Sequence, residues 1–79
     1  MPRDFPDDDD WLLHERRRIG RRIRDTRLDH NLTQEQVFLA VPMNRKFYQE
    51  IEAGLANPSL ETLLRIARAI GVTISDLLG

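Results

Sequence analysis

LTQEQVFLAVPMNRKFYQEIEAG, residues 32–54, predicts two short helices joined by a tight turn. Thr33 and Gln36 have the spacing of a capping box, in which the hydroxyl accepts a free backbone N–H and the glutamine side chain reaches back. The first helix should therefore begin at Gln34. Pro42 lacks an N–H and keeps the preceding residue out of the helical region, so this helix should end one or two residues before it.

The second helix of this stretch should carry positive charge at its start. Asn44 is placed to act as its N-cap, because a short amide can accept from the N–H groups two or three residues further on. The helix should then run from Arg45 to Ala53 and end at Gly54, which tolerates the left-handed conformation of a C-terminal cap. Lys46 follows Arg45, so the first turn of this helix is cationic.

The stretch resembles the helix-turn-helix of the Cro and phage-repressor (XRE-type) DNA-binding family. The matching positions, identical or closely substituted, are Leu32, Thr33, Gln34, Glu35, Val37, Met43, Asn44, Tyr48, Ile51, Glu52 and Gly54. The likeness covers about residues 19 to 78 and includes Asn57, Pro58, Ser59, Leu60, Leu63, Ile66, Ala67, Ile70, Gly71, Val72 and Leu77. It implies an all-α fold, a compact five-helix lambda-repressor-like DNA-binding domain.

Composition indicates one small domain. A chain of 79 residues has little room for a second domain, and the lack of cysteine excludes disulfides, thiolate zinc sites and a cysteine nucleophile. No apolar run is long enough to cross a bilayer, and no signal-peptide pattern opens the chain. We therefore expect a cytoplasmic, nucleoid-associated protein without a membrane partner.

Charge is distributed unevenly along the chain. Residues 1–10 contain five Asp and one Arg, whereas the other 69 residues carry 11 basic and eight acidic side chains, a balance of +3. We expect a flexible acidic tail over residues 1–10 and a helix-turn-helix DNA-binding domain over residues 11–79, with its motif at residues 33–53. The tail is either a solvated segment whose last Asp caps the next helix, or its residues 7–10 fold back over basic side chains and weaken non-specific DNA binding.

Residues 11–30 should be helical, as one long helix or as two shorter ones. Ile19, Ile23 and Thr26 recur at helical spacing, so their face should pack inward. Seven arginines lie within 12 residues here and point around the whole helix, so most should be solvated or paired with nearby acids.

The family resemblance sets one of these arginines apart. It implies a structural ion pair between Arg27 and Glu52, which would tie the first long helix to the second helix of the motif. We expect a partly buried, bidentate bridge, and the rupture of such a pair is costly because it strands a charge.

The C-terminal third should form two more helices. Ser59 is placed as the N-cap of an amphipathic helix that ends at Gly71. A final short helix should begin at Ser75 and continue through Leu78. Its leucines should either complete the core or form the seam of a homodimer.

Two residues within the motif depart from the family pattern. Phe38 stands where a small alanine usually lets the two helices approach, so either the helices separate slightly or the ring swings outward. Pro42 stands where glycine usually permits unusual backbone angles, and its fixed negative φ prevents a left-handed conformation there. We therefore expect a modified turn.

The capped start of the helix at residues 45–53 should present free N–H groups and a partial positive charge, a geometry that suits the DNA major groove. Arg45 can bond N7 and O6 of guanine as a fork, and Lys46 can do so less directionally or contact a phosphate. Gln49 could contact adenine. Glu50 could accept from cytosine N4 or orient Arg45 or Lys46. The resemblance assigns base reading to Arg45, Lys46 and Glu50.

Three amide side chains are candidate phosphate contacts. Gln34 resembles the family's phosphate-binding glutamine at the start of the first motif helix, and Asn44 and Asn57 are further candidates. Such contacts fix the register on DNA and supply most of the affinity, whereas base contacts supply the sequence preference.

The leading hypothesis is a sequence-specific DNA-binding transcriptional regulator that binds double-stranded DNA as a homodimer, on half-sites about one helical turn apart. The alternative is a protein-interaction module on the same fold, such as an antitoxin or an adaptor, which Phe38, Pro42 and the acidic tail favour.

An enzyme is not expected, because the sequence has no nucleophile elbow, metal cluster or glycine-rich phosphate loop. His14 and His30 would lie about 24 Å apart on one helix, so no metal is expected, and neither is a cofactor or a small-molecule ligand.

Overall fold

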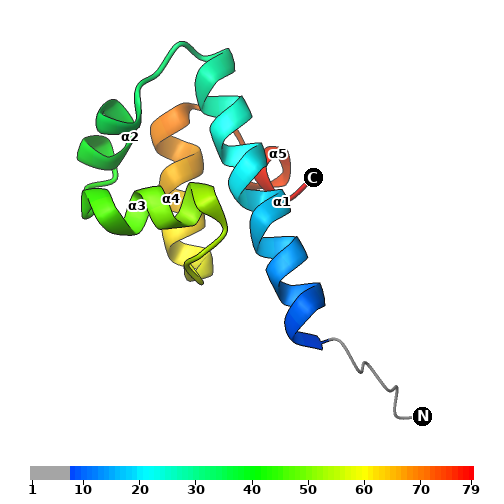
Figure 1. Ribbon diagram of the computed structural model, residues 1–79. Coiled ribbons are helices and arrows are strands. Elements are labelled where there is room, and N and C mark those ends of the chain that lie inside the picture. Colours follow the sequence, from blue (N-terminus) through cyan, green and yellow to red (C-terminus); the bar gives the residue numbers. More distant parts are fainter. Residues whose placement is uncertain (1–7) are drawn as a thin grey trace.

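The structure, a computed structural model, describes residues 8–79 and forms five helices over that range (Figure 1). They are α1 (Asp8–Asp29), α2 (Gln34–Ala40), α3 (Arg45–Ala53), α4 (Leu60–Ile70) and α5 (Ile74–Leu78). The described residues contain no strand, so the prediction of an all-α fold of five helices is confirmed. None of these helices combines the length and the apolarity that a bilayer span requires.

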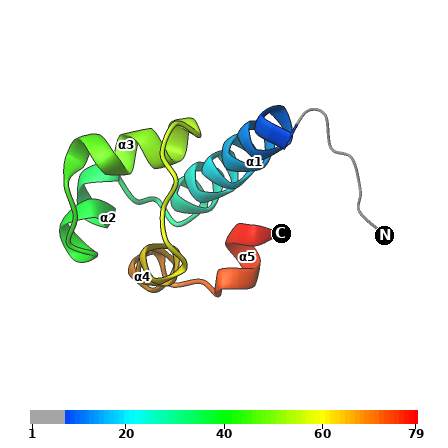
Figure 2. The same cartoon turned by 90° about the horizontal axis from the view of Figure 1, so that it is seen from below.

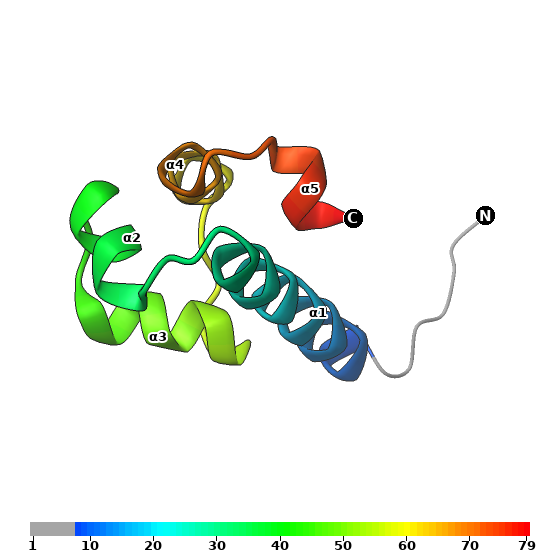
Figure 3. The same cartoon turned by 90° about the horizontal axis from the view of Figure 1, so that it is seen from above.

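Every helix contributes a side chain to one shared core. The largest fully buried side chains, each less than 2% exposed, are one from each helix in turn: Ile23, Val37, Tyr48, Ile66 and Leu77. α1 packs against α3 and α5, and α4 packs against α2 and α5. Figures 2 and 3 show α4 and α5 on one side of the molecule and α1 and α3 on the other, so the core lies between these two layers.

α1 is one continuous helix, which decides between the two arrangements expected for residues 11–30. Ile23 and Thr26 are buried and Ile19 packs against the core, so the prediction of their inward face is confirmed. The helix begins at Asp8, earlier than the boundary expected after residue 10. The rest of the expected tail, residues 1–7, lies outside the described residues.

Gly20 allows the close approach of α1 to the end of α3, a role that the sequence pattern did not indicate. A Cβ atom on Gly20 would lie 2.5 Å from the backbone oxygens of both Ile51 and Glu52. On the other side of the contact, Gly54 ends α3 with φ 78°, and a Cβ there would lie 2.7 Å from the Cα of Arg17. Backbone therefore meets backbone where the two helices cross.

α5 begins one residue earlier than expected and is fastened to α1. Its N-cap is Thr73, which forms a capping box with Asp76, so the prediction that Ser75 opens the helix was wrong by one position. The Arg18 guanidinium donates to the carbonyl oxygen of Leu78 at 2.8 Å, and Arg22 donates to that of Asp76. Two arginines of α1 thus satisfy carbonyls at the end of α5 that have no partner within the helix.

We predict that Gly20→Ala destabilises the protein by about 1 to 3 kcal/mol, because the added methyl group meets backbone atoms that cannot rotate away. Alanine is the better helix former by about 1 kcal/mol, so without the clash the substitution would be stabilising. Urea unfolding followed by circular dichroism measures the difference. Arg24→Ala, at an exposed position of the same helix, is the control. A Gly20→Ala protein as stable as wild type would contradict the close crossing.

Candidate nucleic-acid interface

The caps of α2 and α3 form as the sequence predicts. The Thr33 hydroxyl accepts the backbone N–H of Gln36 at 3.1 Å, and the Gln36 side chain accepts the backbone N–H of Thr33 at 2.8 Å. At the start of α3, Asn44 Oδ1 accepts the backbone N–H of Phe47 at 3.1 Å. α3 ends at Gly54 in the left-handed conformation. Both helices of the motif therefore begin at their predicted residues.

The turn between α2 and α3 is modified at Pro42. The Val41–Pro42 peptide bond is cis, which the sequence did not indicate. α2 ends at Ala40 with Val41 as its cap, and the backbone N–H of Met43 donates to the carbonyl oxygen of Phe38 at 2.7 Å. Among the described residues other than glycine, only Asn31 has positive φ, so the turn avoids the left-handed conformation at Pro42 as expected.

Phe38 stays inside the crossing of α2 and α3. Its side chain is only 7% exposed, and the centroid of its ring lies 6.4 Å from that of Tyr48, with the ring planes tilted by 49°. Of the two expected outcomes, the ring therefore does not swing outward. The guanidinium carbon of Arg45, the first residue of α3, lies 5.4 Å from the centroid of the Phe38 ring.

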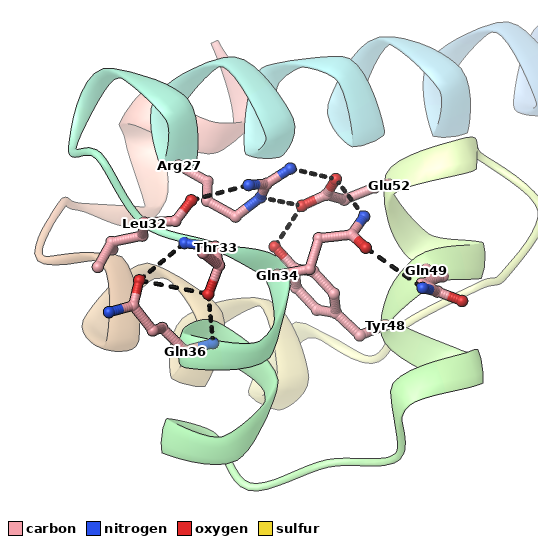
Figure 4. Close-up of polar contacts among 8 residues, drawn as sticks. All are labelled: Arg27, Leu32, Thr33, Gln34, Gln36, Tyr48, Gln49 and Glu52. Carbon is pink, nitrogen blue, oxygen red and sulfur yellow. Dashed lines mark hydrogen bonds and ion pairs between the residues drawn. The ribbon is translucent and has the colours of Figure 1, made fainter.

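Arg27 and Glu52, the pair that the family resemblance implied, form a buried bidentate ion pair between α1 and α3 (Figure 4). Arg27 Nε donates to Glu52 Oε2 at 2.8 Å, and Arg27 Nη2 donates to Glu52 Oε1 at 3.2 Å. The two side chains are 8% and 5% exposed. Arg27 Nη1 also donates to the carbonyl oxygen of Leu32 at 2.8 Å, which holds the segment between α1 and α2.

The Glu52 carboxylate has two further donors that the sequence did not reveal. The Tyr48 hydroxyl, on the same face of α3, donates to Oε2, and Gln34 Nε2 donates to Oε1 at 3.0 Å. Gln34 Oε1 in turn accepts from Gln49 Nε2 at 3.3 Å. Figure 4 shows these side chains as one connected set from Arg27 to Gln49, which we call the Glu52 network.

Burial and hydrogen bonding oppose each other at this carboxylate. Burial raises the pKa of Glu52, but the hydrogen bonds from its three side-chain partners outweigh burial, so the pKa lies below the ordinary value of 4.5. Burial and the hydrogen bond to Glu52 both raise the pKa of Tyr48. The hydrogen bond to the carboxylate also raises the pKa of Arg27. At neutral pH the network therefore contains an ionised acid, an ionised arginine and a neutral phenol.

Three of the candidate base contacts protrude from one side of α3. Arg45, Lys46 and Gln49 are exposed, and Glu50 is half-buried. Arg45 Nη2 lies 3.3 Å from Glu35 Oε2 of α2, a pair that the sequence did not indicate. The sequence suggested Glu50 as the acid that could orient Arg45, whereas in the structure the acid paired with Arg45 is Glu35.

The candidate phosphate contacts are not gathered in one place. Gln34 and Gln49 line an open groove of about 510 Å³ together with Glu35, Phe38 and Arg45. Asn44 lies at the start of α3, where its oxygen is used as the cap. Asn57 is exposed in the loop before α4 and lines a different cavity, about 300 Å³ in volume, beside Arg16 and Leu12 of α1.

Among the side chains that the structure describes, those of residues 10–79, no group of acidic and histidine residues is suited to hold a metal ion. His30 has a local structural contact instead, since its Nδ1 lies 2.9 Å from the carbonyl oxygen of Thr26. The exposed side chains of α3 that can bond a ligand are the cations Arg45 and Lys46 and the amide Gln49.

Because the folded pKa of Glu52 is below its unfolded value, this group adds stability at neutral pH that is lost as the pH falls below about 4.5. We predict that Glu52→Gln costs about 3 to 5 kcal/mol at pH 7, because it leaves Arg27 charged and unpaired in a buried place. The cost should shrink toward acid pH, where wild type loses the same charge. Urea unfolding from about pH 7 to pH 3 measures both effects. Glu61→Gln, which breaks an exposed pair with Arg65, is the control, and equal losses in the two variants would contradict the prediction.

Comparison with known proteins identifies the family. The family model described as Helix-turn-helix matches residues 23–77. The immunity repressor protein of Bacillus phage phi105 is 36% identical over 61 residues, which are 77% of this chain and 42% of that protein. Control protein C.BamHI of Bacillus amyloliquefaciens is 34% identical over 61 residues, covering 76% of this chain and 75% of that one.

Among solved structures, the restriction-modification controller protein C.AhdI from Aeromonas hydrophila superimposes with a TM-score of 0.74 at 28% identity, covering 77% of this chain and 92% of that one. The chain spans less than half the length of the phage repressor that it matches. The family match, by contrast, extends over more than half of this chain and includes the motif and the helices that follow it. The chain therefore belongs to the XRE/Cro-type helix-turn-helix family.

Proposed function

We propose that this protein is a sequence-specific DNA-binding transcriptional regulator that inserts α3 into the major groove. The observation that carries the proposal is the two-sided character of α3. Tyr48 and Ile51 on one side are buried in the core, whereas Arg45, Lys46 and Gln49 on the other are exposed beside the helix start. Family membership and the repressor and control proteins among the relatives support the same function.

In this proposal Arg45, Lys46 and Glu50 contact base edges. The Arg45 side chain is 64% exposed and only one of its nitrogens is paired with Glu35, so its guanidinium can bond N7 and O6 of a guanine. Lys46 bonds a base acceptor or a phosphate, and Glu50 accepts from cytosine N4. Gln49 keeps its amide oxygen and one N–H beyond its bond to Gln34, which are the two groups that an adenine edge requires.

Gln34, Asn44 and Asn57 contact phosphates in this proposal. The Gln34 amide nitrogen donates one hydrogen to Glu52 and keeps a second for a phosphate oxygen. Asn44 uses its oxygen as the cap of α3, which leaves its NH₂ group for the same purpose. Asn57 lies in the loop between α3 and α4, so it would contact a DNA phosphate further from the major groove that α3 enters.

A domain with one short recognition helix contacts few base pairs, so we propose that it binds as a homodimer on two half-sites about one helical turn apart. The proposal includes no catalytic activity, cofactor or small-molecule ligand. Its partner is double-stranded DNA, and we therefore propose a cytoplasmic, nucleoid-associated protein.

A protein-interaction module on the same fold is the second candidate. Exposed leucines favour it, because Leu39 of α2 is 64% exposed and Leu60 and Leu64 of α4 stand one turn apart on the surface. Such side chains can form the contact with another protein. Binding to duplex DNA across a salt series separates the two candidates, since phosphate-dominated binding weakens steeply as salt rises.

We predict that Arg45→Ala relaxes the base preference at one position of the selected site and costs about 1 to 3 kcal/mol there. Selection of bound sequences from a random duplex pool defines the site, and titrations with single-base variants measure the preference. Arg68→Ala, which removes an exposed arginine of α4, should leave the preference intact. Equal weakening on every sequence would show that Arg45 contacts only phosphate.

A further inference from the structure

We propose that Phe38 and Glu35 position Arg45 for base recognition, so that two side chains of α2 help to set the sequence preference of α3. This inference rests on the proposed function, in which Arg45 bonds a base edge. Neither side chain needs to touch DNA for this role. Both act by fixing where the guanidinium group stands before DNA arrives.

The geometry brings all three side chains together. The guanidinium carbon of Arg45 lies 5.4 Å from the centroid of the Phe38 ring, within the range of about 6 Å in which a cation is attracted to an aromatic face. Arg45 Nη2 lies 3.3 Å from Glu35 Oε2. Glu35 and Phe38 are three residues apart on α2, so they share one face of that helix. α2 therefore offers Arg45 an aromatic face and an acceptor at the same place.

The Phe38 ring is itself held in place. It is only 7% exposed, and its centroid lies 6.4 Å from that of the Tyr48 ring, whose hydroxyl donates to Glu52. A fixed ring restricts the side chain that lies over it, whereas a small residue at this position would leave Arg45 free to move. Ordering a long side chain on binding costs affinity, and a side chain that is already ordered loses less.

The arrangement leaves Arg45 able to bond DNA. Its side chain is 64% exposed, and Glu35 engages only one of its terminal nitrogens. Guanidinium carries several N–H donors in a fixed fork, so donors remain for the acceptors of a guanine edge. The contact with α2 therefore orients the Arg45 guanidinium group and leaves N–H donors for DNA.

Glu35 should have opposite effects on affinity and on preference. Its carboxylate is 63% exposed beside a surface proposed to meet phosphates, so its negative charge weakens binding to all DNA. Its bond to Arg45 favours one orientation of the guanidinium group and therefore one base pair. Removing the charge should raise overall affinity and lower the preference at that base pair, a combination that loss of folding would not produce.

The test measures the base preference at the position that Arg45→Ala identifies. Binding is titrated on the selected site and on its single-base variants. We expect Phe38→Leu to lower the preference there by about 2- to 5-fold and to leave other positions unchanged. Phe38→Tyr, which keeps the aromatic ring, should show the base preference of wild type. Glu35→Gln should lower the same preference while total affinity at low salt stays equal or rises. Glu61→Gln breaks an exposed pair of the same 3.3 Å length on α4 and should change neither quantity.

The outcomes separate this inference from the proposed function. If wild type selects a site and Arg45→Ala relaxes one position, but Phe38→Leu and Glu35→Gln leave that position unchanged, the inference alone is overturned. If Phe38→Leu does not fold, Glu35→Gln, at an exposed position, is the deciding variant. An unchanged base preference in Glu35→Gln then overturns the inference. If wild type binds no duplex DNA, or Arg45→Ala relaxes no position, the proposed base reading fails and the inference fails with it.

Discussion

The buried carboxylate of Glu52 determines how three helices meet. It accepts hydrogen bonds from Arg27 of α1, Gln34 of α2 and Tyr48 of its own helix α3. A buried charge that loses a partner costs several kcal/mol, so a shift of any of these helices is opposed at this point. Apolar side chains of equal volume can match such a pair in stability. The particular effect of the carboxylate is on geometry, because its donors come from three different helices and are satisfied together only in this arrangement.

Local signals in the sequence were sufficient to predict the helices. Thr33, Asn44 and Ser59 cap the helices that they were expected to cap, and Gly54 and Gly71 end theirs in the left-handed conformation. A cap depends on side chains within a few residues of each other, so the sequence contains all of the relevant information. The start of α5 was misplaced by one residue although its signal is also local. Thr73 and Asp76 have the spacing of a capping box, which places the first helical residue at Ile74 and not at Ser75.

Two contacts between residues distant in the sequence could not be predicted from it. Nothing near Gly20 indicates that the carbonyls of Ile51 and Glu52 approach it, since that depends on how α1 crosses α3. The pairing of Arg45 with Glu35 likewise depends on the turn between their helices, which contains a cis peptide bond that the sequence pattern did not indicate. The positions of the candidate contacts along the chain were therefore predictable, whereas their orientations were not.

The carboxylate also sets the orientation of amide groups that lie nearer the surface. A carboxylate only accepts hydrogen bonds, so Gln34 must turn its NH₂ group toward Glu52 and its oxygen away. That oxygen can only accept, and in the structure Gln49 presents its own NH₂ group to it. The oxygen of Gln49 is left for an external donor. In this way one buried charge imposes a direction on the hydrogen bonds that lead from the core to the exposed side of α3, and with it the donor and acceptor pattern that α3 offers there.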